Sequence, residues 1–232
     1  MRKNVSIAMA TYNGQKYIKE QIDSILVNMI DGDELIISDD GSKDNTINII
    51  KSYSKSDSRI KLFENKYEHG VKKNFENALL NCNNSIIYLS DQDDIWTDDK
   101  IEKTIKYFEK YNLIIHDCTV INENNNIIID SFYKYRKSKS GIIKNIVKNS
   151  YIGCCMAFKK DLLEKILPIP NNIEMHDQWI GIKAEQNGKV LFIKDKLIKY
   201  RRHSNNTSEL KHYPLIKMLK NRLVLIRELL KK

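Results

Sequence analysis

The sequence is poor in the residues that separate or interrupt domains. Its 232 residues include only three prolines and eight glycines, and no Gly/Ser-rich or Pro-rich stretch divides it. A chain of this length can bury one sizeable core. We therefore expect one domain over residues 1–208, followed by a basic helical tail over residues 209–232.

Long apolar runs are also missing. The run Val5–Ala10 follows Arg2 and Lys3, but Ser6 interrupts it and it ends at Thr11, which is too short for a secretory signal. No stretch approaches the roughly 20 apolar residues of a membrane span. These absences predict a cytoplasmic protein, and leave open attachment to the inner face of the cell membrane.

The cysteine pattern excludes two further classes of protein. Cys82, Cys118, Cys154 and Cys155 form no CxxC pair and no Cys/His cluster, which argues against a zinc site and against a disulfide framework. We expect reduced thiols. The GxGxxG motif of a dinucleotide-binding dehydrogenase is absent as well.

Positive charge is concentrated at the C-terminal end. The formal net charge is +9, and residues 194–232 hold 12 Lys or Arg against 3 Asp or Glu, which is the whole excess. A basic tail suits phosphate groups or an anionic membrane, although it can also serve only solubility. Because the remainder is neutral and its loops are acidic, we expect no binding of nucleic acid.

The first 90 residues alternate between short apolar runs and helical patterns. Such alternation predicts a mostly parallel sheet with helices on its faces. The expected strands are Val5–Ala10, Glu34–Ser38, Ile60–Phe63 and Ser85–Leu89, and the expected helices are Gln15–Asn28, one after Ser42 or Asp44, and Val71–Leu80.

The second half is less regular. We expect a helix over Asp98–Tyr111, a hairpin over Val120–Ile129, a helix over Met175–Asn187 and a mobile basic loop over Ser131–Ser150. Further strands are expected at Leu113–His116, Cys154–Phe158, Val190–Ile193 and Leu197–Tyr200, with a short helix at Asp161–Leu167.

Polar loops follow three of the early strands. They begin at Thr11, Asp39 and Asp91. In open sheets of this kind, ligands bind at the carboxyl ends of the strands. The three loops should therefore share one site.

The loop after the fourth strand carries three carboxylates, Asp91, Asp93 and Asp94. Mutually repelling carboxylates favour a hard cation such as Mg²⁺ or Mn²⁺. A solvated acidic turn, with Asp98 or Asp99 capping the next helix, remains the alternative from the sequence alone.

Together, these loops resemble family-2 glycosyltransferases of the GT-A fold. The matching stretches are Ala10–Gly14, Ser38–Thr46 and Leu89–Trp96, and His176–Trp179 and Tyr200–Asn206 resemble acceptor-side motifs of bacterial rhamnosyl- and galactosyl-type surface-polysaccharide transferases. The resemblance implies an α/β, Rossmann-like, mostly parallel central sheet with helices on both faces and a C-terminal amphipathic helix. It also implies a nucleotide-binding half over residues 1–97 and an acceptor half over residues 98–208.

The resemblance implies an inverting enzyme that transfers a sugar from a UDP- or dTDP-linked donor to a glycan or lipid-linked glycan. It implies Asp177 as general base, Asp93, Asp91 and His203 as ligands of Mn²⁺ or Mg²⁺, and Trp96, His176 and Trp179 as acceptor contacts. The implied nucleotide-sugar contacts are Thr11, Tyr12, Asn13, Asp39, Asp40, Lys73, Asn74, Asp91, Gln92 and Arg202.

Several of these roles have structural alternatives. Asp177 can be an ordinary aspartate of a first helical turn, and His203 a structural histidine. Relatives carry a cation near the start of the third helix, where either Lys72 or Lys73 can supply it. His176 departs from the usual acidic pair at the base position, which leaves its role open. A catalytically inactive relative that acts as a scaffold is the alternative for the whole chain.

The segment Tyr213–Lys232 follows helical spacing, with an apolar stripe that includes Leu215, Leu219 and Leu223. Such a helix can lie on an anionic membrane, or it can pack on the domain or on a second subunit. The sequence leaves these alternatives, the oligomeric state and the transferred sugar open.

Overall fold

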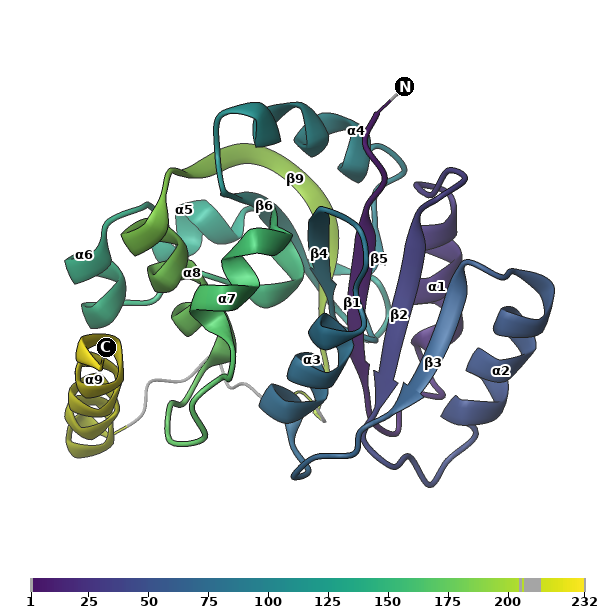
Figure 1. Cartoon of the computed structure of the whole chain (residues 1–232), viewed down its shortest axis with the longest axis horizontal. Helices are drawn as coiled ribbons and strands as arrows, with labels where there is room; N and C mark the ends of the chain where they lie inside the picture. Colours follow the sequence, from purple (N-terminus) through teal and green to yellow (C-terminus); the bar gives the residue numbers. More distant parts are fainter. Residues whose placement is uncertain (1, 205, 207–213, 232) are drawn as a thin grey trace.

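The computed structural model describes residues 2–204, 206 and 214–231. A single curled sheet runs through the molecule, and helices cover both of its faces (Figure 1). The predicted α/β class is confirmed. Residue 205, within the matching stretch Tyr200–Asn206, and residues 209–213, at the start of the predicted tail, lie outside the described part. Within that part, no helix has the length and apolar character of a membrane span.

The first four strands form the parallel half of the sheet, as predicted. Their order is β3-β2-β1-β4, with every neighbouring pair parallel. The elements are β1 (Ser6–Thr11), α1 (Ile18–Leu26), β2 (Glu34–Asp39), α2 (Thr46–Ser56), β3 (Ile60–Glu64), α3 (Val71–Leu80) and β4 (Ile86–Ser90).

The second half extends the sheet with strands of mixed direction. Beyond β4 the order is β8-β6-β9-β5, and β7 pairs with β6. The elements are β5 (Ile95–Trp96), α4 (Lys100–Ile105), the 3₁₀ turn Lys106–Glu109, β6 (Leu113–Asn122), β7 (Ile127–Ile129), α5 (Phe132–Arg136), α6 (Ile142–Val147), the 3₁₀ turn Gly153–Cys155, β8 (Met156–Lys159), the 3₁₀ turn Lys160–Leu162, α7 (Leu163–Ile166), α8 (His176–Asn187), β9 (Val190–Arg202) and α9 (Leu215–Leu230).

Two predicted strands are one continuous strand. Residues 190–202 form β9, which pairs in parallel with β6 through register shifts near Asp117. Figure 1 shows β9 curving over the sheet. Polar residues 194–196 separate the two predicted strands in the sequence, and they lie at this irregularity. The apolar pattern is therefore interrupted where the strand only bends.

The prediction of a mobile loop over residues 131–150 was wrong, because this segment contains α5 and α6. The Ser131 side chain caps α5 by accepting a hydrogen bond from the Lys134 amide. Glu185, on α8, accepts from the Gly141 amide at 2.8 Å just before α6 begins. A carboxylate 44 residues away therefore fixes a segment whose own sequence has little apolar periodicity.

Candidate functional site

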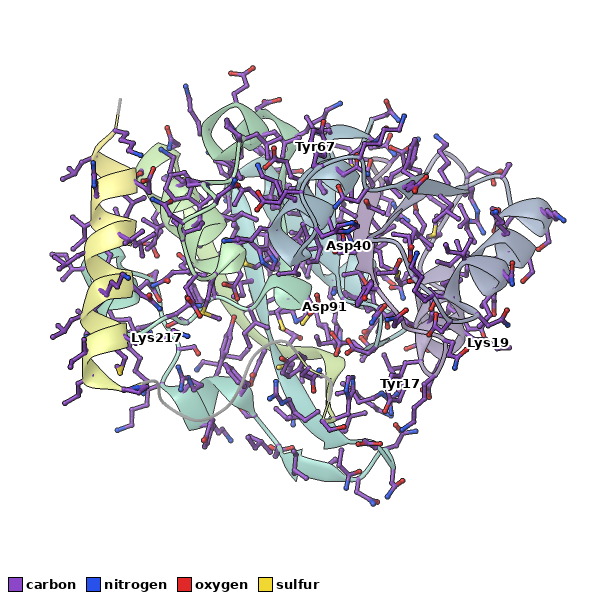
Figure 2. All side chains as sticks on the ribbon, turned by 90° about the horizontal axis from the view of Figure 1, so that it is seen from below. Tyr17, Lys19, Asp40, Tyr67, Asp91 and Lys217 are labelled. Atoms are coloured by element: carbon purple, nitrogen blue, oxygen red, sulfur yellow. The ribbon has the colours of Figure 1, made fainter. Side chains whose placement is uncertain are left out.

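A cavity of about 960 Å³ opens at the carboxyl ends of β1, β2 and β4, closed on its other side by the start of α8. Figure 2 views the molecule from this edge, with Asp40 and Asp91 near the centre. Its walls are formed by Ala10, Thr11, Tyr12, Asp40, Gly41, Lys43, Glu64, His69, Gly70, Val71, Asn74, Asp91, Gln92, Asp93, Ile152, Gly153, Glu174, Met175, His176, Asp177, Tyr200 and Asn206.

Asp39 organises the first two loops from behind the cavity wall. Its carboxylate accepts hydrogen bonds from Thr11 Oγ1 at 2.9 Å, from the Ser42 amide at 2.8 Å and from Ser42 Oγ at 2.6 Å. The Asp39 side chain is buried and is not part of the wall. Its acceptor capacity is used inside the protein.

The neighbouring Asp40 is the carboxylate that faces the cavity. It accepts from Asn65 Nδ2 at 2.6 Å and from the Gly70 amide at 2.8 Å. Gly70 has a φ of +128°, a backbone conformation that is unfavourable for residues with a Cβ atom. These bonds set the start of α3 against the second loop and hold Asp40 in place.

The first and third loops are joined by one side-chain amide. Gln92 Oε1 accepts from the Tyr12 amide at 2.9 Å, and Gln92 Nε2 donates to the Tyr12 carbonyl at 3.0 Å. This paired contact leaves the Tyr12 ring half exposed at the cavity. An exposed aromatic ring in this position is suited to stacking on a planar base.

Asn74 also reaches the cavity, from α3. Its Nδ2 donates to the Thr11 carbonyl at 3.0 Å, while its Oδ1 is buried and has no partner among the described residues. A buried acceptor without a partner is costly. It offers an acceptor for a hydrogen-bond donor on a ligand.

The acidic cluster lies where the third loop meets β9. Burial, then the charges of Asp93 and Asp177, raise the pKa of Asp91 to about 7. Burial, then the charges of Asp93 and Asp91, raise the pKa of Asp94 well above its usual value. Burial and mutual repulsion thus both disfavour the charged form of these carboxylates.

The carboxylates of the cluster suit a hard divalent cation, whereas the neighbouring Cys154 thiol, whose pKa burial raises well above its usual value, does not. Oxygens of Asp91 and Asp94 and the Cys154 sulfur lie within 4.8 Å of one another, and Asp94 Oδ2 is buried with no partner among the described residues. Carboxylate oxygens prefer hard ions such as Mg²⁺ and Mn²⁺. The orphaned oxygen and the raised pKa values both fit an added positive charge at the cluster.

The end of β9 and the segment after it hold the acidic loop. Arg201 donates from its amide to Asp94 Oδ1 at 2.9 Å and from Nε to the Asp93 carbonyl at 2.8 Å. His203 Nε2 lies 2.8 Å from Asp93 Oδ2, and Asn206 Nδ2 lies 3.3 Å from the same oxygen. His203 is therefore placed beside the proposed ligand Asp93.

Asp177 faces the acidic cluster from the first turn of α8. Its carboxyl is buried, and burial raises its pKa to about 7, although hydrogen bonds such as that from the Gln178 amide at 2.6 Å partly offset this. Asp177 is close enough for its charge to raise the pKa of Asp91. A carboxylate with this pKa can accept a proton near neutral pH.

His176 lines the cavity next to Asp177. Its ring stacks on Phe75 with 4.6 Å between ring centroids, and its Nε2 is buried without a partner among the described residues. Burial, followed by the charge of Lys72, lowers the pKa of His176 to about 4. The imidazole is therefore neutral at pH 7.

Several residues predicted for the site lie away from the main cavity. Asn13 and His203 line a smaller neighbouring cavity of about 290 Å³. Lys73 is paired with Glu76 at 3.0 Å, and Lys72 donates to the carbonyls of Asn171 and Ile173. Neither lysine is in the wall of the main cavity.

The two tryptophans and Arg202 are also outside the wall. Trp96 is buried beneath the Lys100 side chain, and Trp179 Nε1 donates to the Ile166 carbonyl at 2.9 Å in the core. Arg202 Nη1 donates to the Tyr200 hydroxyl at 3.2 Å. The two tryptophans therefore lie in the core, whereas Arg202 contacts Tyr200, a residue of the cavity wall.

Sequence reasoning missed some residues that the fold places at the site. Lys43 and His69 are in the cavity wall, and Arg201 holds the acidic loop from inside the protein by donating to Asp94 and to the Asp93 carbonyl. Lys43 and Arg201 lie within the motif stretches, which could have signalled them. Nothing in the sequence around His69 signals its position.

Comparisons with known proteins identify a family and a fold. The family model described as "Glycosyl transferase family 2" matches residues 6–167. The UDP-Glc:alpha-D-GlcNAc-diphosphoundecaprenol beta-1,3-glucosyltransferase WfgD of Escherichia coli is 32% identical over 79% of this chain and 71% of its own length. The dTDP-rhamnosyl transferase RfbG of Shigella flexneri is 31% identical over 85% of this chain and 72% of its own length.

Solved structures show the same fold at lower sequence identity. S. aureus TarS 1–349 in complex with UDP-GlcNAc superposes with a TM-score of 0.74 at 16% identity, covering 96% of this chain and 66% of that one. The mannosyltransferase PcManGT from Pyrobaculum calidifontis, in complex with GDP-Man and Mn²⁺, gives 0.67 at 18% identity, covering 89% and 59%. The chain thus spans slightly less than two thirds of these solved chains.

Proposed function

The chain belongs to glycosyl transferase family 2, and from this premise we propose an inverting transfer of a sugar from a UDP- or dTDP-linked donor to a glycan hydroxyl. The observation that carries the proposal is one cavity that holds Asp40, Asp91, Asp93 and Asp177. Nucleotide-recognising loops, an acidic cluster and a buried base on the opposite wall are the parts that such a transfer needs.

The donor nucleoside binds between the first two loops. Tyr12 stacks on the base, Asp40 accepts hydrogen bonds from the nucleoside, and the unpartnered Asn74 Oδ1 is a further acceptor. Asp39 acts behind them by fixing Thr11 and Ser42. The sequence had predicted both Asp39 and Asp40 as contacts of the nucleotide-sugar, and this assignment gives the direct contact to Asp40.

Asp177 is the general base. It removes the proton from the acceptor hydroxyl as that oxygen attacks the anomeric carbon, opposite to the diphosphate. The new carbon–oxygen bond forms as the bond to the diphosphate breaks, and the proton ends on Asp177. A single displacement inverts the configuration at that carbon. The raised pKa of Asp177, about 7, makes it a stronger base than an exposed aspartate.

Asp93 and Asp91 would hold Mn²⁺ or Mg²⁺, with His203 beside Asp93. When bound, such an ion offsets the negative charge that develops on the diphosphate leaving group. Arg201 positions the loop that carries both ligands, and the unpartnered Asp94 Oδ2 would be a further oxygen donor to the ion. The acidic cluster, with its raised pKa values, supports this assignment.

The names of the relatives suggest the substrates. One relative uses UDP-glucose and an acceptor on diphosphoundecaprenol, and another is named for dTDP-rhamnosyl transfer. We infer a UDP- or dTDP-sugar donor and a lipid-linked glycan acceptor in the synthesis of a bacterial surface polysaccharide. Such an acceptor would place the reaction at the inner face of the cell membrane.

A thermal-shift panel tests the donor half of the proposal. UDP, dTDP, GDP and CMP are each added with Mn²⁺, Mg²⁺ or EDTA, since a ligand that binds the native state raises Tm. We expect metal-dependent stabilisation by UDP or dTDP that Asp93→Ala removes and Asp98→Ala, at an exposed position outside the cavity, retains. Absence of stabilisation by any nucleotide would contradict the proposal.

A further inference from the structure

Two short stretches far apart in the sequence form one end of the molecule. Figure 1 shows α9 beneath α6, at the end opposite α2. Arg222 Nη2, on α9, donates to the Val147 carbonyl of α6 at 2.7 Å, and Leu225 is buried. Glu228 accepts from Asn172 Nδ2 at 2.7 Å. One side of α9 is therefore fixed to the body.

The rest of α9 presents apolar side chains to solvent. Leu215, Leu219, Leu223, Ile226 and Leu230 are spaced by three or four residues, so they form one stripe along the helix, and all are exposed. Leu215 is 76% exposed and Leu223 68%. Neighbouring α6 adds Ile143, 80% exposed, and Val147. We call these side chains the apolar stripe.

Positive charge surrounds the apolar stripe. Residues 131–150, which include α5 and α6, contain six Lys or Arg and no Asp or Glu. Helix α9 contains Lys217, Lys220, Arg222 and Arg227, and Lys231 follows it. The one acidic residue of α9, Glu228, is buried and bonded to Asn172 and Lys231. The charges that α6 and α9 present to solvent are thus cationic, although Lys217 is paired with the exposed Glu174 beside them.

We propose that α6 and α9 dock this protein on an anionic phospholipid bilayer, with the apolar stripe inserted among the headgroups and the flanking lysines on the lipid phosphates. Exposed leucines along a cationic helix are the combination that binds such a surface. A second copy fits less well, because a two-fold contact would bring this cationic surface against itself.

The docking surface adjoins the mouth of the cavity. Lys217 Nζ lies 3.5 Å from Glu174 Oε1, and Glu174 is in the cavity wall. Figure 2 shows Lys217 on α9 to one side of the centrally placed Asp91. A bilayer against α9 therefore lies next to the Asp177 side of the cavity. The docking itself does not depend on the chemistry that the cavity performs.

Vesicle co-sedimentation of the full chain, without nucleotide, tests this proposal. Vesicles of phosphatidylcholine containing about 30% phosphatidylglycerol should bind the chain, and pure phosphatidylcholine should bind it much less. Leu219→Ser/Leu223→Ser should weaken the partition constant by at least about tenfold, because it removes inserted apolar surface. Lys148→Glu/Lys220→Glu should weaken it by more than about fivefold per site.

Matched controls use exposed residues elsewhere on the molecule. Val27→Ser/Leu80→Ser removes two exposed apolar side chains, and Lys51→Glu/Lys55→Glu reverses two charges on α2. Both should bind like the unchanged chain. Because all the substituted side chains are exposed, every variant should fold. Melting curves that match the unchanged chain would verify this.

Three results would overturn the proposal. The first is equal binding to neutral and anionic vesicles. The second is equal loss of binding in the test and control variants. The third is self-association that Leu219→Ser/Leu223→Ser abolishes, without vesicle binding, which would assign the stripe to a second copy. Since binding is measured without donor or acceptor, a failure here is distinguishable from a failure of the proposed transfer.

Discussion

Asp177 combines burial with a place in the first turn of α8. Burial disfavours its negative charge, and the Gln178 amide only partly offsets that effect, which leaves its pKa at about 7. The helix N-terminus favours a carboxylate there. An aspartate in this environment changes its protonation state within the range where an enzyme works.

The pH dependence of turnover should report this carboxyl. A general base acts in its deprotonated form, so kcat/KM should fall about tenfold for each pH unit below about 7 and level off above it. The measurement is initial-rate release of the nucleoside diphosphate from the donor at saturating Mn²⁺.

Asp91 has a raised pKa too, so the assignment needs a variant. In Asp177→Asn, the residual kcat/KM should no longer fall as the pH drops below about 7. A variant that retains the full limb would assign the step to Asp91 or another group.

Arg201 is a buried cation whose bonds converge from three parts of the chain. Its guanidinium pairs with Glu20 of α1 at 2.6 Å, donates to Asn125 in the β6–β7 turn and donates to the Asp93 carbonyl at 2.8 Å. These contacts hold the acidic loop against β9. Arg201 thus acts on the site as a positioning residue.

Replacing this side chain should cost stability. Arg201→Met should lower the free energy of unfolding by about 2 kcal/mol, because buried charged hydrogen bonds are lost. Urea unfolding measures the change. Lys196 is on the same strand as Arg201 and forms an exposed ion pair with Asp130. Lys196→Met, which removes that pair, should cost about 0.5 kcal/mol or less. Equal losses in the two variants would contradict a special role for Arg201.

Among the elements, the parallel strands are tied together at their amino ends by Glu34. Its carboxylate accepts from Ser6 Oγ of β1, from Lys61 Nζ of β3 and from the Asn83 amide before β4. Burial opposes the charged form, but these bonds outweigh burial and lower the pKa of Glu34 to about 2.

This lowered pKa predicts a pH-dependent contribution to stability. Glu34→Gln should destabilise the fold by about 2 kcal/mol at neutral pH. Because the folded-state pKa lies below the unfolded value, the contribution is complete above about pH 4.5. It should disappear as the pH falls towards about 2.

Urea unfolding of both proteins at several pH values measures the difference. The exposed Glu102→Gln should leave stability unchanged throughout. A Glu34→Gln difference that stays constant from neutral to acidic pH would contradict this account.

Elements differ in how far the sequence foretold them. The strands and helices of the first half were predicted because each carries its own apolar periodicity, as Ile18, Ile22 and Ile25 do in α1. Helices α5 and α6 were missed because distant contacts hold them, including the Gly141–Glu185 bond. The two-residue strand β5 was also missed, since it exists only through pairing with β9.

Across the whole molecule, the sequence predicted which loops come together at one edge of the sheet but not how each side chain is placed there. Strand topology brings Thr11, Asp40 and Asp91 to one edge, and the motifs signalled Asp177. Which of Asp39 and Asp40 faces the cavity depends on a local turn that spacing does not reveal. Likewise, the burial of Trp96 and Trp179 depends on packing between elements that the motifs do not describe.

Charge of opposite sign gathers in two regions of the molecule. The cavity gathers carboxylates, while the surface formed by α6 and α9 carries cations around the apolar stripe. Fields of opposite sign would attract a cation to the cavity and an anionic bilayer to the helices. The two regions adjoin where Lys217 Nζ of α9 lies 3.5 Å from Glu174 Oε1 of the cavity wall.

In the proposed transfer, the first two loops and the acidic cluster with its ion bind the donor, while Asp177, across the cavity, accepts the proton of the acceptor hydroxyl. The most direct measurement compares Asp177→Asn with the unchanged chain, using UDP-glucose and dTDP-rhamnose with Mn²⁺, for both donor affinity and nucleoside diphosphate release. We expect donor affinity within about twofold and release slowed by about a hundredfold or more. Unchanged release, or loss of donor binding together with release, would contradict it.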